Sequence, residues 1–139
     1  SSNNISLISK LAPKIYITSF PNEFLQALVS IFNNSIDALK LLEIEYKAIL
    51  IEAKDHENVI EINIKDTGGG FKKEILESIF EPYITTKHKS MGVGLGLYTV
   101  YKIITSHMEG TITASNEEHE LNNKIYVGAT IQIKLFRSQ

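Results

Sequence analysis

The sequence predicts an α+β fold: a two-layer α/β sandwich in which three helices cover one face of a mixed, mostly antiparallel sheet. Three observations support this prediction. One long apolar stripe has helical spacing, several segments alternate apolar and polar residues as strands do, and the two kinds of segment interleave along the chain. With 139 residues, 43% of them hydrophobic, the chain is long enough for one well-packed domain.

The N-terminal segment contains a polar Ser-Ser-Asn-Asn stretch, so we expect residues 1–13 to be a linker or chain end and residues 14–137 to form the domain. Residues 14–19 are a short β-rich run. A helix is expected to begin near Pro21, because the apolar residues after it recur every three or four positions and so form one buried stripe. The stripe consists of Phe24, Leu28, Phe32, Ile36 and Leu39.

Four strands are expected beyond this helix, because apolar and polar residues alternate in each of them. They cover residues 49–54, 59–65, 111–114 and 125–136. The first two form a hairpin with one buried side, and the last two form an antiparallel pair joined by a polar loop at 116–123.

Two further helices are expected between the two strand pairs. Residues 72–80 read as a short helix, and residues 94–107 recover helical spacing after a gap. The gap, residues 81–93, shows no sustained periodicity of either kind and is typical of a mobile loop.

Two glycine clusters are the most informative feature for function. Residues 66–70 read Asp-Thr-Gly-Gly-Gly at a strand end, and residues 92–97 read Gly-Val-Gly-Leu-Gly-Leu at a helix start. Glycine lets the backbone approach a base or a phosphate where a Cβ would collide. Asp66 can accept a hydrogen bond from an exocyclic amine, and the Asn34 amide oxygen can join phosphate oxygens around Mg2+. Together these features predict an ATP site, although neither cluster has Walker or Rossmann spacing.

Composition excludes several other classes of function. The net charge is -2 and the lysines are scattered, so we expect no nucleic-acid partner. No apolar run approaches the roughly 20 residues that cross a bilayer, and we expect no membrane contact by this chain. The chain has no cysteine, which fits a reducing compartment, and a cytoplasmic location is favoured mainly because ATP is there.

Five motifs in sequence order resemble those of the catalytic, ATP-binding domain of sensor histidine kinases. This domain has the Bergerat fold and belongs to a wider group with gyrase B, Hsp90 and MutL. The matching segments are residues 24–38 for the N box, 66–71 for the first glycine box, 79–87 for the F box, 92–97 for the second glycine box and 128–130 for the motif after it. Any one motif alone would be weak, but five in the right order are a strong signal, and they cover nearly the whole chain.

The resemblance implies roles for individual residues. Asn34 would bind the Mg2+ that bridges the phosphates, with Ser30 as a second candidate metal ligand. Asp66 would read the adenine amino group, and Thr130 would support Asp66 through water. Lys87, in the expected loop, would reach the phosphates, although a solvated loop lysine is the alternative. The implied ATP-binding residues are Asn34, Asp37, Ala38, Asp66, Gly68, Gly70, Ile75, Phe80, Thr86, Lys87, Gly92, Gly94, Leu95, Gly96, Leu97 and Thr130.

The function implied by the resemblance is that of a protein-histidine kinase domain. It would supply the ATP γ-phosphate to a histidine on a dimerisation domain of the same, homodimeric protein, for relay to a response regulator. That histidine must lie outside this chain, because none of the four histidines fits the phosphoacceptor pattern. His56 and His119 are expected in turns, His88 in the loop, and His107 at a helix end.

Position 30 departs from the family pattern. Most of these kinases carry asparagine four residues before Asn34, and gyrase-type ATPases carry a glutamate that activates water, whereas this chain has Ser30. Serine cannot act as a general base near neutral pH, which disfavours an autonomous ATPase. One alternative is a degenerate nucleotide-binding module with a regulatory or docking role. Another is a serine/threonine kinase of the anti-sigma type, although the F box and loop sequence favour the histidine-kinase branch.

Overall fold

The structure is a computed structural model that describes residues 5–11, 21–82 and 96–137. Strands pair in the order β1-β2-β3-β5-β4 to form one five-stranded sheet. The strands are β1 (Ser6–Leu11), β2 (Ala48–Asp55), β3 (Val59–Asp66), β4 (Thr111–Leu121) and β5 (Lys124–Phe136). Only β1 and β2 run parallel, so the sheet is mixed and mostly antiparallel, as predicted.

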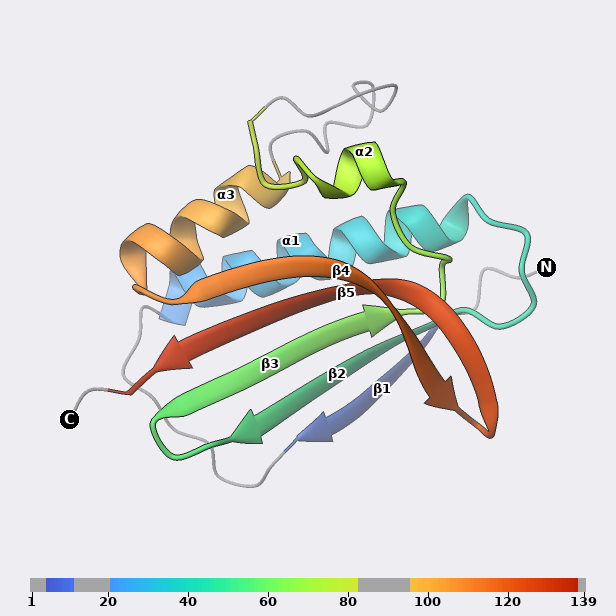
Figure 1. Cartoon of the computed structure of the whole chain (residues 1–139), viewed down its shortest axis with the longest axis horizontal. Helices are drawn as coiled ribbons and strands as arrows, with labels where there is room; N and C mark the ends of the chain where they lie inside the picture. The colour runs from blue at the N-terminus through green and yellow to red at the C-terminus, as the bar shows by residue number, and fades with distance from the viewer. Residues whose placement is uncertain (1–4, 12–20, 83–95, 138–139) are drawn as a thin grey trace.

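The helices lie together on one face of this sheet (Figure 1). They are α1 (Pro21–Lys40), α2 (Lys73–Leu76) and α3 (Gly96–Lys102), and α3 continues into a π-helical turn at Ile103–His107. The predicted α/β sandwich is therefore confirmed. The short helix is four residues long rather than nine, because the chain after Leu76 continues as turns.

The core forms between α1 and the sheet. Ala27, Ile31 and Leu39 of α1 are at most 1% exposed and pack against the isoleucines of β3. The expected stripe residues Phe24, Leu28, Phe32 and Ile36 flank this line and are partly buried. Fully burying one such side chain contributes about 1.5–3 kcal/mol, so packing rather than helix propensity holds α1 in place.

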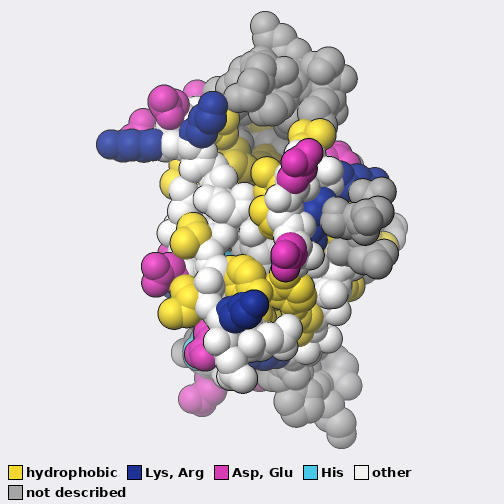
Figure 2. Space-filling view, turned by 90° about the vertical axis from the view of Figure 1, so that its right-hand side faces the viewer, with side chains coloured by type: hydrophobic (Ala, Val, Ile, Leu, Met, Phe, Trp, Pro, Cys, Tyr) yellow, Lys and Arg dark blue, Asp and Glu magenta, His cyan; other side chains and the backbone are white. Residues whose placement is uncertain are grey.

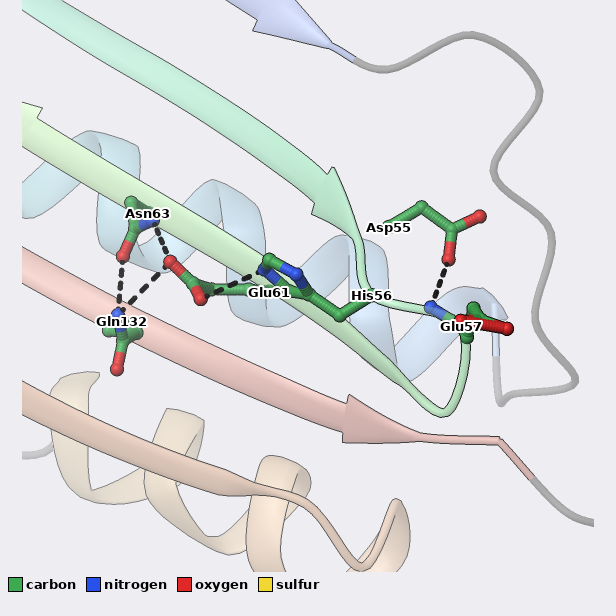
Figure 3. A network of polar contacts seen from close by, with 6 residues as sticks. All are labelled: Asp55, His56, Glu57, Glu61, Asn63 and Gln132. Carbon is green, nitrogen blue, oxygen red and sulfur yellow. Dashed lines mark hydrogen bonds and ion pairs between the residues drawn. The ribbon is translucent and has the colours of Figure 1, made fainter.

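The other face of the sheet carries polar side chains that bond to one another. The Glu61 carboxylate accepts hydrogen bonds from Asn63 Nδ2 at 2.8 Å and from Gln132 Nε2 at 3.3 Å, and His56 Nε2 lies 3.3 Å from it (Figure 3). At the far end of the same face the polar side chains give way to a small apolar cluster. It consists of Ala48, Leu50 and Leu121, with Ile8, Tyr46 and Tyr126 packed around them. This cluster anchors the long β4–β5 hairpin.

One expectation about the strands needs correction, and a second is not tested. Ser6–Leu11, placed in the expected linker 1–13, is the edge strand β1, which pairs with β2 from Ser6↔Ala48 to Leu11↔Ala53. The expected strand at 14–19 lies outside the described residues.

The polar loop expected at 116–123 was also wrong. β4 continues to Leu121, and only Asn122 and Asn123 turn the chain, at φ of 53° and 65°. Paired asparagines tolerate the left-handed conformation that a two-residue hairpin turn requires. The glutamates face solvent while His119 and Leu121 are buried, so polarity here marks the exposed side of an edge strand.

Figure 2 shows the end of the molecule at which this hairpin tip lies. Hydrophobic side chains mix there with acidic and basic ones, and the lysines are scattered across the visible face. Ile125 and Val127 of β5 and Leu41 after α1 are among the exposed apolar side chains of the described residues.

Candidate functional site

Asp66 is the last residue of β3, and its side chain is 7% exposed. Its Oδ1 accepts hydrogen bonds from the backbone N–H groups of Gly68, at 2.9 Å, and Ala129, at 3.1 Å. Among the described residues no donor bonds to Oδ2 and no cation pairs with the carboxylate. The two bonds to Oδ1 therefore fix the orientation of the carboxylate, while Oδ2 remains available to accept a hydrogen bond from a ligand.

The environment of Asp66 favours the protonated acid. Burial raises the pKa of the Asp66 carboxyl above its ordinary value of 3.8. The backbone N–H groups of Gly68 and Ala129, which donate to the carboxylate, oppose this rise. Buried carboxyl groups with strongly perturbed pKa values are frequent at functional sites, because a ligand can donate the hydrogen bonds that the protein does not.

The glycine loop after Asp66 is tied to the start of β2 and to β5. The Thr67 hydroxyl donates to Tyr46 O at 3.0 Å and accepts from Ala48 N–H at 3.1 Å. Gly69 N–H donates to Val127 O at 2.9 Å. Gly69 and Gly70 have φ of 85° and 89°, a conformation that favours glycine.

Gly70 also lies against a side chain of β4, a contact that the sequence did not reveal. A Cβ at this position would lie 2.5 Å from Oδ1 of Asn116 on β4. The Asn116 amide pairs twice with the backbone of Phe71: Phe71 N–H donates to Oδ1 at 2.9 Å, and Nδ2 donates to Phe71 O at 2.8 Å. Asn116 falls in the polar loop predicted from the sequence, and no local pattern marks it as a residue that contacts the glycine loop.

His119 is the other residue that sequence reasoning missed. It lies in β4 rather than in a turn, is 7% exposed, and has Nε2 2.6 Å from Asp66 O. Its alternation with buried Leu121 between exposed glutamates was the available signal. The other described histidines lie as expected, His56 in the β2–β3 turn and His107 at the end of the helix.

The N-box residues share one face of α1. Ser30, Asn34 and Asp37 are half-buried and stand four and three residues apart, and Ala38 is exposed beside them. Asn34 Nδ2 donates to Ser30 O at 3.1 Å. This bond fixes the Asn34 amide and directs its acceptor oxygen away from the helix backbone.

The C-terminal half of α1 lies beside the glycine loop. A Cβ at Gly68 would meet Leu39 Cδ2 at 3.3 Å and Leu42 Cδ1 at 3.4 Å. Figure 1 shows the end of β3 and the last turns of α1 at the same side of the molecule. The fold thus brings the N-box helix and the first glycine cluster together.

The remaining predicted residues fall into three groups. Ile75 and Phe80 are half-buried, and Phe80 stacks on Tyr101 of α3 with ring centroids 5.7 Å apart. Leu97 is 7% exposed and belongs to the core, just after Gly96 begins α3. The third group lies outside the described residues: Thr86, Lys87, Gly92, Gly94 and Leu95, with His88.

Thr130 pairs with Lys65, next to Asp66 in β3, and its expected support of Asp66 through water stays a prediction. The direct contact from β5 to the Asp66 carboxylate is the Ala129 backbone N–H. The Thr130 hydroxyl is buried without a hydrogen-bond partner among the described residues.

Residues 21–139 match the family model described as Histidine kinase-, DNA gyrase B-, and HSP90-like ATPase. The chain belongs to this family. The sensor histidine kinase ZraS of Escherichia coli is 32% identical over 102 residues, which are 73% of this chain and 20% of ZraS. Sporulation kinase B of Bacillus subtilis is 30% identical over 133 residues, 95% of this chain and 28% of that protein. The chain thus spans less than a third of these curated relatives.

Solved structures agree on the fold. The catalytic domain of histidine kinase ThkA superposes with a TM-score of 0.77 at 22% identity, covering 97% of this chain and 81% of ThkA's. Full-length ShkA superposes with a TM-score of 0.74 at 21% identity, covering 99% of this chain and 27% of ShkA's. The family model and the curated relatives, rather than these structures, identify the chain as an ATP-binding catalytic domain of the sensor-histidine-kinase type. Within the described residues, no helix is long and apolar enough to cross a membrane.

Proposed function

We propose that this catalytic domain binds ATP through Asp66 and supplies the γ-phosphate to a histidine on a separate dimerisation domain of the same protein. A buried carboxylate oriented by two backbone N–H groups, with its second oxygen uncommitted, carries the proposal. The adenine amino group is a donor that needs such an acceptor. A hydrogen bond to a charged group contributes about 1.5–3 kcal/mol net, enough to select adenine.

The metal expected with ATP is Mg2+, and Asn34 is the proposed ligand. Its Nδ2 already donates to Ser30 O, which leaves Oδ1 as an acceptor for a hard cation. No group of three acidic or histidine side chains among the described residues could hold a metal by itself. Mg2+ characteristically takes few protein ligands and several phosphate or water oxygens, so one amide oxygen is compatible with it. The ion would neutralise charge on the phosphates.

The acceptor histidine is proposed to lie outside this chain. His119 is buried against Asp66 O, and His56 is paired with Glu61 on the opposite face of the sheet. The relatives are several times longer than this chain, which leaves room for a dimerisation domain. ThkA has been solved in complex with the response regulator TrrA, and ShkA in complex with AMPPNP. By analogy, relay to a response regulator in the cytoplasm completes the proposal.

The domain limits are proposed anew. β1 completes the edge of the sheet. Ile5, just before β1, packs against the main core, and Ile8 of β1 packs against the small apolar cluster. We therefore place the start of the ATP-binding unit at β1 rather than at residue 14, and its end at residue 137.

The proposed function is tested by calorimetric titration with a non-hydrolysable ATP analogue and with ADP, each with and without Mg2+. Micromolar to low-millimolar binding that strengthens with Mg2+ and weakens in Asp66→Asn is expected. Ser30 motivates the second candidate, a regulatory or docking module without kinase activity. Binding that is indifferent to Mg2+, or no binding at all, would contradict the kinase function and favour that module.

A further inference from the structure

The carbonyl oxygen of Asp66 lies just beyond the last residue pair of the β3–β5 ladder, so no residue of β5 pairs with Asp66 in that ladder. The last pair of the β3–β5 ladder is Lys65↔Thr130, one residue before Asp66. Thr67 N–H, in the same peptide unit, donates to Ala48 O of β2 at 3.2 Å. Because C=O and N–H of a trans peptide point in opposite directions, Asp66 O points away from β2, toward β5 and β4. A buried carbonyl there needs a donor.

The His119 ring supplies that donor from β4. Its Nε2 lies 2.6 Å from Asp66 O, and a carbonyl oxygen can only accept, so Nε2 carries the hydrogen. The other ring nitrogen, Nδ1, is buried without a partner among the described residues. The ring is thus committed to one contact, at the cost of leaving its second nitrogen unsatisfied.

Gly128 makes the contact sterically feasible. Asp66 O packs so closely on Gly128 that a Cβ there would lie 1.6 Å from it. Gly128 pairs with Glu117 and Tyr126 pairs with His119, so Gly128 and His119 lie on the same side of the β4–β5 hairpin. The missing side chain lets the imidazole reach across β5 to the end of β3.

We propose that His119 is a positioning residue for adenine recognition, which holds the main chain of Asp66 and thereby aims its carboxylate, without touching the nucleotide. This inference rests on the proposed function, because the Asp66 carboxylate is the adenine acceptor in both. The carbonyl and the carboxylate share one Cα, and Oδ1 is already held by Gly68 and Ala129. Fixing the carbonyl removes the remaining freedom of the residue, and preorganisation of this kind raises affinity.

The first test is the tautomer of the ring. Long-range proton–nitrogen correlation spectra of the 15N-labelled chain are expected to show a hydrogen on Nε2 of His119. The Nε2 resonance should shift when ADP is added, because the carbonyl beside it belongs to the residue that binds the base. A hydrogen on Nδ1 in the free chain would overturn the proposal.

The second test compares ADP affinity in three variants by calorimetry. His119→Leu removes the donor, and a loss of about tenfold in affinity is expected, the scale of an unsatisfied buried acceptor. His119→Gln keeps an N–H near Nε2 and should bind within about threefold of the unmodified chain. Leu121→Ala is the matched control, since Leu121 lies two residues along the same strand, is 6% exposed, and contacts the apolar cluster rather than Asp66.

The outcomes separate this inference from the proposed function. If Leu121→Ala lowers thermal stability but keeps ADP affinity while His119→Leu loses affinity, His119 acts on the site. Equal loss of affinity in the two variants, or unchanged affinity in His119→Leu, would overturn the positioning role while leaving ATP binding intact. An unmodified chain that binds no ADP would overturn the proposed function first, and this inference with it.

Discussion

The two ends of the β2–β3 hairpin carry one aspartate each, in opposite environments. Asp55, at the end of β2, is exposed and pairs with Arg137, whose Nη1 lies 2.6 Å from Oδ1. Asp66, at the end of β3, is buried and has backbone donors but no cation among the described residues. The first arrangement supports the fold, whereas the second keeps acceptor capacity free for a ligand. The proposed binding site thus lies at the end of the hairpin where the aspartate has no charged partner among the described residues.

The two carboxylates should give stability opposite dependences on pH. The Arg137 hydrogen bond and the Glu57 N–H lower the pKa of Asp55 below 3.8, so its stabilisation is present above that pH and lost as pH falls through the folded pKa. Burial raises the pKa of Asp66 above 3.8, so ionising it costs stability as pH rises through its folded pKa.

The largest effect is expected at the binding end, from Gly128→Ala. The new Cβ would meet backbone atoms of Asp66 at 1.6 Å and 2.5 Å, which no side-chain rotation can relieve. A loss of about 3 kcal/mol or more in the free energy of unfolding is expected, with loss of ADP binding. Urea unfolding measures the first effect and calorimetry the second.

Gly69→Ala is the control for that experiment. Unlike Gly128, Gly69 has a positive φ, 85°, and nothing lies within 4 Å of a Cβ there. It should cost only the backbone strain, about 1–2 kcal/mol. Equal destabilisation by the two substitutions would mean that the close approach to Asp66 does not constrain the fold.

Asp66→Asn should separate binding from stability. The new amide oxygen can still accept from Gly68 and Ala129, while its N–H₂ group would face the adenine amino group. We expect ADP affinity to fall by about 30-fold, from the loss of a charged acceptor. Thermal stability at pH 7 should be equal or higher, because the cost of burying a charge disappears, and this gain should vanish near pH 4. A less stable variant at pH 7 would contradict this account of the site.

Asn116→Ala tests whether nucleotide binding also needs the hydrogen bonds that fix the glycine loop to β4. It removes both hydrogen bonds to Phe71, and a loss of about 1 kcal/mol in ADP binding is expected. Amide hydrogen exchange at Phe71 should accelerate, because its N–H loses an acceptor. Asn116→Asp keeps that acceptor but loses the donor to Phe71 O, so it should protect the Phe71 amide better than alanine does. Identical exchange in both variants would exclude this role.

The smallest effect is expected at the other end, from Asp55→Asn. The exposed pair with Arg137 is screened by salt, so the melting temperature should fall slightly at pH 7 and low ionic strength. The difference from the unmodified chain should shrink below pH 4, as the native carboxylate is protonated. ADP affinity should not change. A change in ADP affinity would show that the two ends are coupled and would break the comparison.

Local sequence was sufficient for much of the fold. Helix α1 and the β2–β3 hairpin were predictable because apolar residues recur with the period of each element, and burial follows that period. The glycine cluster after β3 was predicted to be a ligand loop because glycine and aspartate have distinctive backbone and hydrogen-bonding properties. The role of Asp66 as a site residue, inferred on these grounds, stays a prediction.

Tertiary structure alone decided the rest. β1 pairs with a strand about forty residues away, and its six residues, three of them apolar, have no periodicity that distinguishes them from a linker. β4 is an edge strand whose glutamates face solvent, so it read as a loop. Its contacts to Asp66 and Phe71 join residues 53 and 45 positions apart. Local patterns record which residues are buried, but the partner of a polar side chain depends on which distant backbone the fold brings beside it.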